Sequence, residues 1–360
     1  MTGMRIDDVR ELWEQETVYL NTASYGLPPR PAWDAVQAAL GDWRAGRTSW
    51  EHWGDSTEAA RHSFARMCSV PVGWVAIGAN ASTMVGLVAA ALPDGSRVLS
   101  TEAEFTSALW PFLAQARGIE TDCVPVGRLA EAIGAGTDAV VFSAVQSSNG
   151  ELADLEGVAA AAAHHGALTV VDATQACGWL PIDGRRFDVL VCSGYKWLLG
   201  PRGTGFMTVR PEVSERLTPH GAGWYAGDDP HDSYYGPPLR LSSEARRFDV
   251  SPAWFSWVGA APALELLVDI GVEQINAHNL RLANLFRDGL GLEPGDSAIV
   301  AAEVPGVEEL LRGSGVMAAG RAGLLRTSWH LYNDENDVER ALDVLSRGAG
   351  RPPVRGSASA

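Results

Sequence analysis

Between residues 96 and 194 the sequence repeats one pattern, in which about five apolar or β-branched residues are followed by polar loop material. The runs lie within 96–105, 121–126, 138–150, 168–174 and 187–194. Short apolar strands that alternate with helices are typical of a mainly parallel sheet covered on both faces. The pattern therefore predicts an α/β fold with a ligand site at the carboxyl ends of the strands.

Other segments have the spacing of apolar residues that predicts helices. Helices are expected at 31–45, from about 80 onward, at 155–165, within 257–290 and after Asn333 or Asp334. Gly166 is expected to be the C-cap of the third of these helices. The stretch 226–247 is polar and contains glycine and proline, so a long loop is expected there.

Composition and charge exclude several classes of protein. A net charge of −16 with no basic stripe argues against binding to nucleic acid or to an anionic membrane. The first residues are acidic and amphipathic, so neither a signal peptide nor a transit peptide is expected. The four cysteines show no CxxC pair and no metal-like spacing with histidine, which predicts reduced thiols, no metal site and a cytoplasmic location.

Asp172 and Lys196 each stand at or just beyond the end of an apolar run, where parallel strands open into loops. A lysine amine in a water-poor pocket can form a Schiff base with a carbonyl, and pyridoxal 5′-phosphate is held in this way. That cofactor also needs a carboxylate facing its pyridine nitrogen, because the protonated ring absorbs carbanion charge. We therefore expect Lys196 and Asp172 to be catalytic residues at opposite ends of one pyridine ring.

The cofactor has three further requirements: a phosphate cradle at a helix N-terminus, a flat stacking partner and a donor to its phenolic oxygen. The candidates are Ser82, Thr83, Ser193 and Tyr195 for the phosphate, Phe105 for the ring, and Gln175 for the phenolic oxygen.

Each of these residues alone has a simpler explanation. A lysine after a strand is usually a solvated loop residue, an aspartate there often forms a turn, and Ser-Thr at a helix start is usually a cap. The stretch GPRGTG at 200–205 resembles a nucleotide loop, but no Lys-Ser or Lys-Thr follows it, so a P-loop is not expected. The ordered set at successive strand ends favours the cofactor site.

Three stretches together resemble the class V aminotransferases: VVDATQA, CSGYKWLLGPRGTGF and LLRTSWHLYNDENDVERAL. These are fold type I pyridoxal-phosphate enzymes, and they include cysteine desulfurases, isopenicillin-N epimerase-like proteins and C–S lyases. The resemblance implies a mainly parallel sheet of the seven-stranded type with helices on both faces, plus a smaller α+β C-terminal domain. The implied divisions are an N-terminal arm (1–25) joining the small domain, a large cofactor-binding domain (26–255), a small domain (256–347) and a disordered tail (348–360).

By matching position, the resemblance assigns the same roles to Lys196 and Asp172 as the residue chemistry does. It also places Arg326 where the family binds the substrate α-carboxylate, a bidentate task that suits a guanidinium. The substrate-binding residues that it adds are Ala23, Ser24, Gln146 and Ser147. FDVSPAW matches a loop that a partner subunit donates toward the phosphate, which implies a cofactor-binding role for Ser251 and a homodimer with active sites at the subunit interface.

The chain departs from the desulfurases of this family in two places. Those enzymes carry a mobile cysteine shortly before the carboxylate-binding arginine, whereas residues 310–329 contain no cysteine. They also stack a histidine on the ring, whereas residues 102–111 contain none, so the stacking residue is Phe105 or, in a shifted register, Glu104. A persulfide-forming desulfurase is therefore not expected.

The resulting prediction is a pyridoxal-phosphate-dependent lyase or aminotransferase that acts at Cα or Cβ of a small amino-acid substrate. The preferred reaction is β-elimination from an S-substituted cysteine conjugate in secondary or thiol metabolism. Transamination, epimerisation and decarboxylating oxidative deamination are alternatives, and a non-catalytic binding protein for the cofactor is the alternative of a different class. Trp50, Trp53 and Trp224 are expected in loops that cover a bulky substrate, or in the core.

Overall fold

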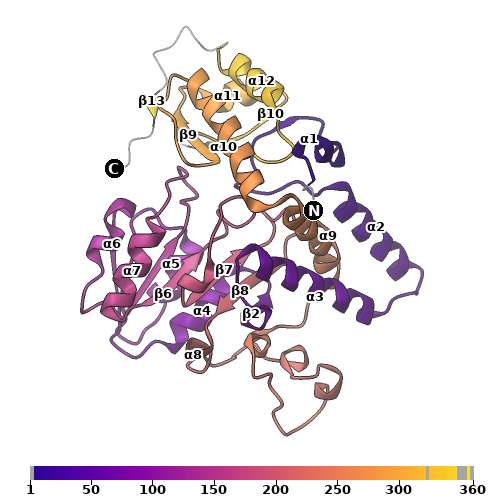
Figure 1. Ribbon diagram of the computed structural model, residues 1–360, viewed down its shortest axis with the longest axis vertical. Helices are drawn as coiled ribbons and strands as arrows, with labels where there is room; N and C mark the ends of the chain where they lie inside the picture. Colours follow the sequence, from indigo (N-terminus) through magenta and orange to yellow (C-terminus); the bar gives the residue numbers. More distant parts are fainter. Residues whose placement is uncertain (1–3, 322–323, 347–354, 357–360) are drawn as a thin grey trace.

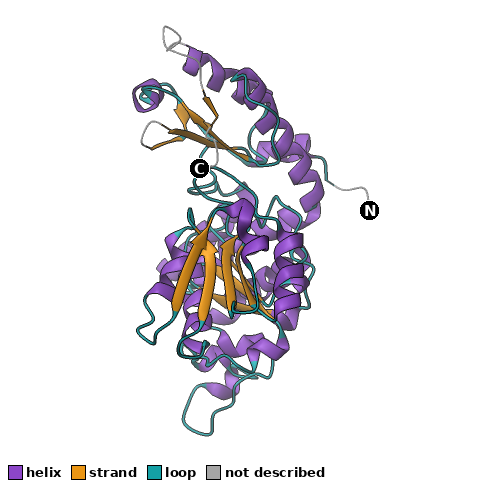
Figure 2. Cartoon of the chain, turned by 90° about the vertical axis from the view of Figure 1, so that its left-hand side faces the viewer, coloured by secondary structure: helices purple, strands orange, loops and turns teal. Residues whose placement is uncertain are grey.

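The structure, a computed structural model, describes residues 4–321, 324–346 and 355–356. A large unit is built around one sheet, and a smaller unit contains the last helices of the chain (Figure 1). Seen from the side, helices flank the large sheet and the small unit lies beyond its upper end (Figure 2).

A seven-stranded sheet forms the centre of the large unit. In spatial order its strands are β2 (Val75–Gly78), β8 (Gly205–Val209), β7 (Val189–Ser193), β6 (Leu168–Asp172), β5 (Ala139–Ser143), β3 (Arg97–Thr101) and β4 (Glu120–Val124). Neighbours pair in parallel from β7 to β4, whereas β8 is antiparallel to both of its neighbours. The predicted mainly parallel sheet is confirmed, and Asp172 and Ser193 end adjacent strands.

Both faces of the central strands β5, β6 and β7 are buried, which explains why these strands are mainly apolar, whereas the edge strand β4 is largely exposed. The helices around the sheet are α2 (Arg30–Arg44), α3 (Trp50–Met67), α4 (Ala81–Ala91), α5 (Thr106–Leu113), α6 (Leu129–Ala132), α7 (Leu155–His165), α8 (Pro211–Ser214) and α9 (Trp254–Ile270). Val140 and Val171 belong to a core shared with α3, α7 and α9. Val141 and Val170 belong to the opposite core, which α4 and α5 complete. Successive residues of one strand thus serve different cores.

Two helix ends follow the chemistry of their capping residues. The side chain of Asn80 accepts a hydrogen bond from the backbone N–H of Thr83 and so caps the N-terminus of α4. Gly166 takes the left-handed conformation (φ 74°) at the end of α7, as predicted.

Trp50 and Trp53 lie in helix α3 and not in the loop predicted from the sequence. Trp50 begins an eighteen-residue helix, and its ring stacks on that of Trp254 with centroids 5.7 Å apart. Trp224 and Tyr234 pack edge-on against the same ring. The prediction that Trp50 and Trp53 lie in a loop is wrong, because these residues form the first turn of α3. The polar excursion after β8, which projects at the bottom of Figure 1, packs onto this aromatic cluster.

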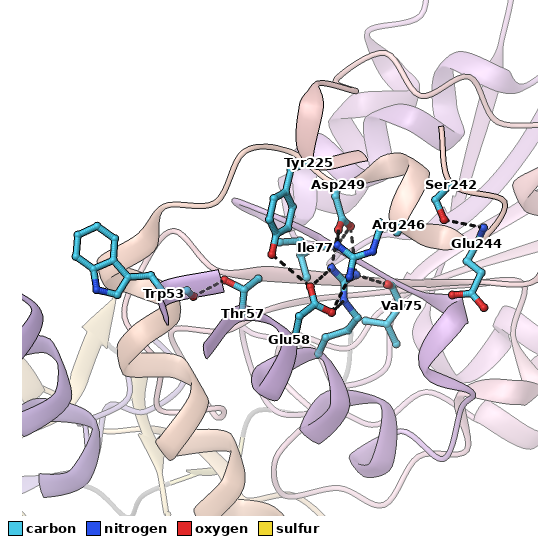
Figure 3. Close-up of polar contacts among 11 residues, drawn as sticks. Trp53, Thr57, Glu58, Val75, Ile77, Tyr225, Ser242, Glu244, Arg246 and Asp249 are labelled. Carbon is cyan, nitrogen blue, oxygen red and sulfur yellow. Dashed lines mark hydrogen bonds and ion pairs between the residues drawn. The ribbon is translucent and has the colours of Figure 1, made fainter. Parts of the chain in front are cut away.

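A buried ion-pair network joins α3 to the segment before α9. The Arg61 guanidinium lies 2.5 Å from Asp249 Oδ2 and 3.1 Å from Glu58 Oε2, and it donates to the Val75 carbonyl at 2.6 Å. The other Asp249 oxygen accepts from the Ile77 N–H at 2.8 Å (Figure 3). The network therefore fixes helix α3 and strand β2 to the same carboxylate.

The small unit contains an antiparallel sheet of β11 (Ala319–Arg321), β12 (Leu324–Ser328), β9 (Ile299–Glu303) and β13 (Arg355–Gly356), in that order. Helices α10 (Val272–Gly289), α11 (Val307–Leu311) and α12 (Glu335–Ser346) share its core. The start of the chain joins this unit, because β1 (Val18–Tyr19) pairs in parallel with β10 (Val316–Met317). The predicted smaller α+β C-terminal unit is confirmed.

The numerical limits of the predicted domains stay predictions. Helix α9 crosses the expected boundary at residue 256 and packs against α2 and α3 of the large unit. Most of the predicted tail, 348–360, lies outside the described residues. None of the helices in the described ranges could cross a membrane alone; α9 and α10 reach the necessary length and apolarity only as a pair that bends by 84°.

Candidate active site

A cavity of about 360 Å³ lies at the carboxyl ends of β5, β6 and β7. The N-terminus of α4 and the loop after β7 complete its wall. The residues predicted from the sequence that line this cavity are Ser82, Phe105, Ser147, Asp172, Gln175, Ser193, Tyr195 and Lys196. The sheet thus brings together groups from loops that are separate in the sequence.

Asp172 is the last residue of β6 and is 5% exposed. Its Oδ1 accepts a hydrogen bond from the backbone N–H of Thr174 at 2.8 Å. Burial raises the pKa of the Asp172 carboxyl, and the Thr174 hydrogen bond and the charge of Lys196 oppose that rise. A carboxylate in this environment is suited to a cationic partner in the cavity.

The turn that carries Lys196 is held tightly. Leu199 is buried and has a φ of 57°, a conformation that costs a non-glycine residue about 1–2 kcal/mol. Gly26 approaches the turn so closely that a Cβ at this position would lie 2.0 Å from the Lys196 carbonyl oxygen. The surrounding packing therefore imposes the position of Lys196.

The Lys196 amine titrates close to neutrality. Burial lowers its pKa to about 8; Asp172 opposes this shift, and Arg326 and Arg202 add to it. The Nζ atom lies 5.3 Å from the centroid of the Phe105 ring. Part of the Lys196 population is thus neutral near pH 8, and the neutral amine is the form that attacks carbonyls and removes protons.

The N-terminus of α4 is organised by Asn80. Its Oδ1 accepts hydrogen bonds from the hydroxyls of Ser82 at 2.8 Å and Thr83 at 2.6 Å. Ser193 Oγ accepts from the Ala81 N–H at 3.2 Å, which ties the end of β7 to this helix. Ser82 borders the cavity, whereas Thr83 borders a separate apolar groove, so their shared assignment to the phosphate stays a prediction.

Glu104 and Phe105 have different surroundings. The Glu104 carboxylate accepts from the Ser143 N–H at 2.8 Å and from the Thr101 hydroxyl at 2.9 Å, and the Gln146 amide also donates to it, at 3.3 Å. Phe105 instead borders the cavity. Glu104 and Gln146 thus contact each other inside the fold and do not line the cavity, and Phe105 is the one of the two stacking candidates that does.

Gln175 joins the cavity to the N-terminal arm. Its amide donates to the Ala23 carbonyl at 2.9 Å, and its side-chain oxygen accepts from the Trp197 indole at 2.7 Å. This places Ala23 beside the cavity wall. The assigned contact of Gln175 with the phenolic oxygen of the cofactor stays a prediction.

Arg326, on β12 of the small unit, does not line the cavity itself but contacts Ser147, which does. It donates to the Ser147 carbonyl at 2.5 Å and to the Ser24 hydroxyl at 2.6 Å. Three segments that are remote in the sequence therefore meet at one guanidinium. Ser251, by contrast, is exposed and does not border the cavity.

Arg202 is a cavity residue that the sequence reasoning did not assign. It stands in the GPRGTG stretch, which was tested only as a nucleotide loop. The sequence could have indicated this position, because Arg202 follows the expected Schiff-base lysine by six residues and belongs to the same loop after the strand.

The groups around this cavity fit pyridoxal 5′-phosphate. Asp172 and Lys196 border the same space, and within the described ranges no ion pair joins them, so each charge faces the cavity without a protein partner of opposite sign in contact. Ala81 and Ser82 at the N-terminus of α4 line the cavity, and a helix N-terminus suits a phosphate; Phe105 supplies a flat surface.

The chain belongs to the aminotransferase class-V family, whose model matches residues 18–305. It is accordingly a pyridoxal-phosphate-dependent enzyme, and the non-catalytic alternative has no support.

The chain is 28% identical to the uncharacterized aminotransferase YcbU of Bacillus subtilis (strain 168), over 83% of this chain and 85% of that protein. It is 27% identical to isopenicillin N epimerase of Streptomyces clavuligerus, over 95% and 97%. Among solved structures, a cysteine desulfurase from Thermococcus onnurineus NA1 is similar with a TM-score of 0.84 at 24% identity, covering 97% of this chain and 100% of that one. This likeness confirms the predicted fold type I architecture.

Proposed function

We propose that the protein is a C–S lyase that cleaves an S-substituted cysteine conjugate by β-elimination, in secondary or thiol metabolism. The observation that carries this proposal is the chemistry of the cavity wall: among its described residues Lys196 supplies the one amine, and neither a cysteine nor a histidine lines the space. The reaction converts R–S–CH₂–CH(NH₃⁺)–COO⁻ and water into R–SH, pyruvate and ammonium.

Each residue has a defined task in this reaction. When bound, pyridoxal phosphate supplies an electron sink that stabilises negative charge at the substrate Cα. The negative charge of Asp172 keeps the pyridine nitrogen protonated, and the Arg326 guanidinium holds the substrate α-carboxylate. The neutral Lys196 amine then removes the Cα proton, and the thiolate leaves from Cβ.

The same wall argues against two other reactions of the family. Transfer of sulfur to the protein needs a thiol that faces the substrate, but Cys68, Cys177 and Cys192 are buried and do not line the cavity, and Cys123 lies on β4. Epimerisation by two bases needs a second base besides Lys196. His330, the nearest histidine in sequence to Arg326, is fully buried, and its Nε2 lies 3.0 Å from the Trp197 carbonyl oxygen.

The proposal also includes a cytoplasmic homodimer. In that assembly Ser251, which is exposed on one chain, would serve the phosphate of the neighbouring site. Cross-linking or light scattering of the purified protein measures the oligomeric state directly.

The test is a visible spectrum of the holoenzyme with S-methylcysteine, with pyruvate, ammonium and methanethiol assayed together. We expect the three products in equal amounts. Alanine has no leaving group at Cβ and is the matched control, which should change the spectrum without releasing pyruvate catalytically. Loss of the visible band without pyruvate would identify a transaminase, and exchange of the Cα proton for deuterium without further products would identify an epimerase; either result refutes the lyase.

A further inference from the structure

Arg202 presents an unused guanidinium at the cavity. Its side chain borders the cavity together with Lys196, and its Cζ lies 4.7 Å above the centroid of the Tyr195 ring. Within the ranges that the structure describes, no residue accepts a hydrogen bond from this guanidinium or forms an ion pair with it. An arginine has five N–H donors, and the one contact of this guanidinium found within those ranges is with a ring face.

The backbone of Arg202 is nevertheless fixed on both sides. Its N–H donates to the Tyr25 hydroxyl at 3.2 Å, and its carbonyl accepts from the Ser256 hydroxyl at 2.8 Å. The Tyr25 ring in turn packs on the Tyr195 ring, with centroids 5.5 Å apart. The guanidinium is thus pre-positioned by its main chain and by a cation–π contact, and these leave its donors available.

The same contacts link Arg202 to the arm residues that contact Arg326. Tyr25 directly follows Ser24, whose hydroxyl accepts from Arg326 at 2.6 Å. The two guanidinium groups are therefore connected through adjacent residues of the N-terminal arm. Both charges also lower the pKa of Lys196, so both lie within electrostatic reach of the amine.

We propose that Arg202 binds a second carboxylate of the substrate, so that the enzyme selects amino acids that carry an acidic group beyond Cβ. This role of Arg202 rests on the proposed function in one respect, namely that Arg326 binds the α-carboxylate. One guanidinium then holds the α-carboxylate while the other holds the distal acid, on opposite sides of the bond that breaks. A carboxylate matches the fork geometry of arginine better than a neutral amide does.

The competing anion is the phosphate of the cofactor. Ser82, at the N-terminus of α4, and Ser193 also line the cavity, and they are tied to Asn80 and Ala81 rather than to the arm. Arg202 is tied to the arm residue Tyr25 instead, which favours the substrate.

The test compares S-carboxymethylcysteine with S-carbamoylmethylcysteine, which has the same shape and no second charge. The wild-type holoenzyme should favour the acid in kcat/KM by about 10- to 100-fold, mainly through KM, which is the range for a hydrogen bond to a charged group. Arg202→Ala should remove this preference, and Arg202→Lys should restore part of it. The affinity of the apoenzyme for pyridoxal phosphate, measured by titration of the visible band, should stay within threefold of wild type.

Two outcomes overturn the inference. If Arg202→Ala weakens both substrates equally and lowers the affinity for pyridoxal phosphate, Arg202 belongs to the phosphate site. If the wild type does not distinguish acid from amide, no second anion is recognised. Spectral titration with glutamate and glutamine separates this question from the reaction itself: a preference for glutamate that Arg202→Ala abolishes supports the inference even if no thiol is ever released.

Discussion

Two groups of buried charged side chains in this protein have different surroundings. Around Arg61 the charges are in direct contact (Figure 3). Burial alone would lower the pKa of Arg61, but Asp249 and Glu58 raise it; burial alone would raise the pKa of Glu58, but Arg61 and Arg246 lower it. Attraction therefore outweighs desolvation for Arg61 and Glu58, whereas burial still raises the pKa of their partner Asp249. The donors and acceptors of this network are used within the fold.

At Asp172 and Lys196 the balance is reversed. Burial raises the pKa of the carboxyl and lowers that of the amine to about 8, so desolvation outweighs their mutual attraction. The two groups stand across a cavity rather than in contact. Buried charges in direct contact, as around Arg61, join parts of this fold to one another. Buried charges without a contacting partner of opposite sign, such as Asp172 and Lys196, cost stability and are typical of ligand sites.

The largest expected effect on the free energy of unfolding comes from breaking the ion-pair network around Arg61. Asp249→Ala leaves the Arg61 guanidinium buried without its closest partner, which typically costs about 3–5 kcal/mol. Urea unfolding of the apoprotein, followed by circular dichroism, measures this loss in the free energy of unfolding. Tyr225→Phe is the matched control, because the Tyr225 hydroxyl meets Glu58 only at 3.3 Å, and its loss should cost no more than about 1 kcal/mol. Equal effects of the two variants would contradict a special role for the ion pair.

The second effect has the opposite sign. Lys196→Met removes a buried amine that the fold disfavours in its charged form, so the free energy of unfolding of the apoprotein at pH 7 should increase. A pKa lowered from 10.5 to about 8 corresponds to at most about 3 kcal/mol, so we expect a gain of about 1–3 kcal/mol. The same variant should lose the visible band of bound cofactor. A variant that unfolds more easily than wild type would show that Lys196 stabilises the fold.

The smallest effect is the pH dependence of that gain. Between about pH 8 and pH 10.5 the unfolded chain keeps a proton on Lys196 that the folded protein has released, so the unfolded state binds more protons and wild-type stability rises with pH. The difference between Lys196→Met and wild type should therefore shrink over this window. Urea midpoints of both proteins at pH 7, 8, 9 and 10 measure it, and a difference that grows with pH would reverse the sign of the assigned shift.

The sequence predicted the large sheet well because the signals there are local. A short, mainly apolar run such as that within 168–174 indicates a strand with both faces covered, and the end of the run then shows where Asp172 must lie. The left-handed Gly166 and the helix start at Asn80 are local in the same sense. Trp50 was misplaced because its partners Trp254 and Trp224 are distant in sequence, and only their packing shows that the segment is helical.

Long-range contacts also explain what was missed at the site. The register of Glu104 and Phe105 depends on Ser143, which lies on another strand. The position of Arg202 depends on its contacts with Tyr25 and Tyr195, and no spacing rule connects residue 25 with residue 202. Reading the strand-end loops as a group finds the cavity, but it does not show which of their side chains lack a partner.

The contact between Ser24 and Arg326 spans 302 positions of the chain, and this has a consequence for biosynthesis. When the ribosome has released the chain as far as β8, every strand of the large sheet has been made, together with Asp172 and Lys196, but Arg326 does not yet exist. The N-terminal arm, although synthesised first, must wait for the last strands of the small unit before it finds its partners. The residues that line the cavity are thus made early, and the contact between Ser24 and Arg326 can form only when synthesis is nearly complete.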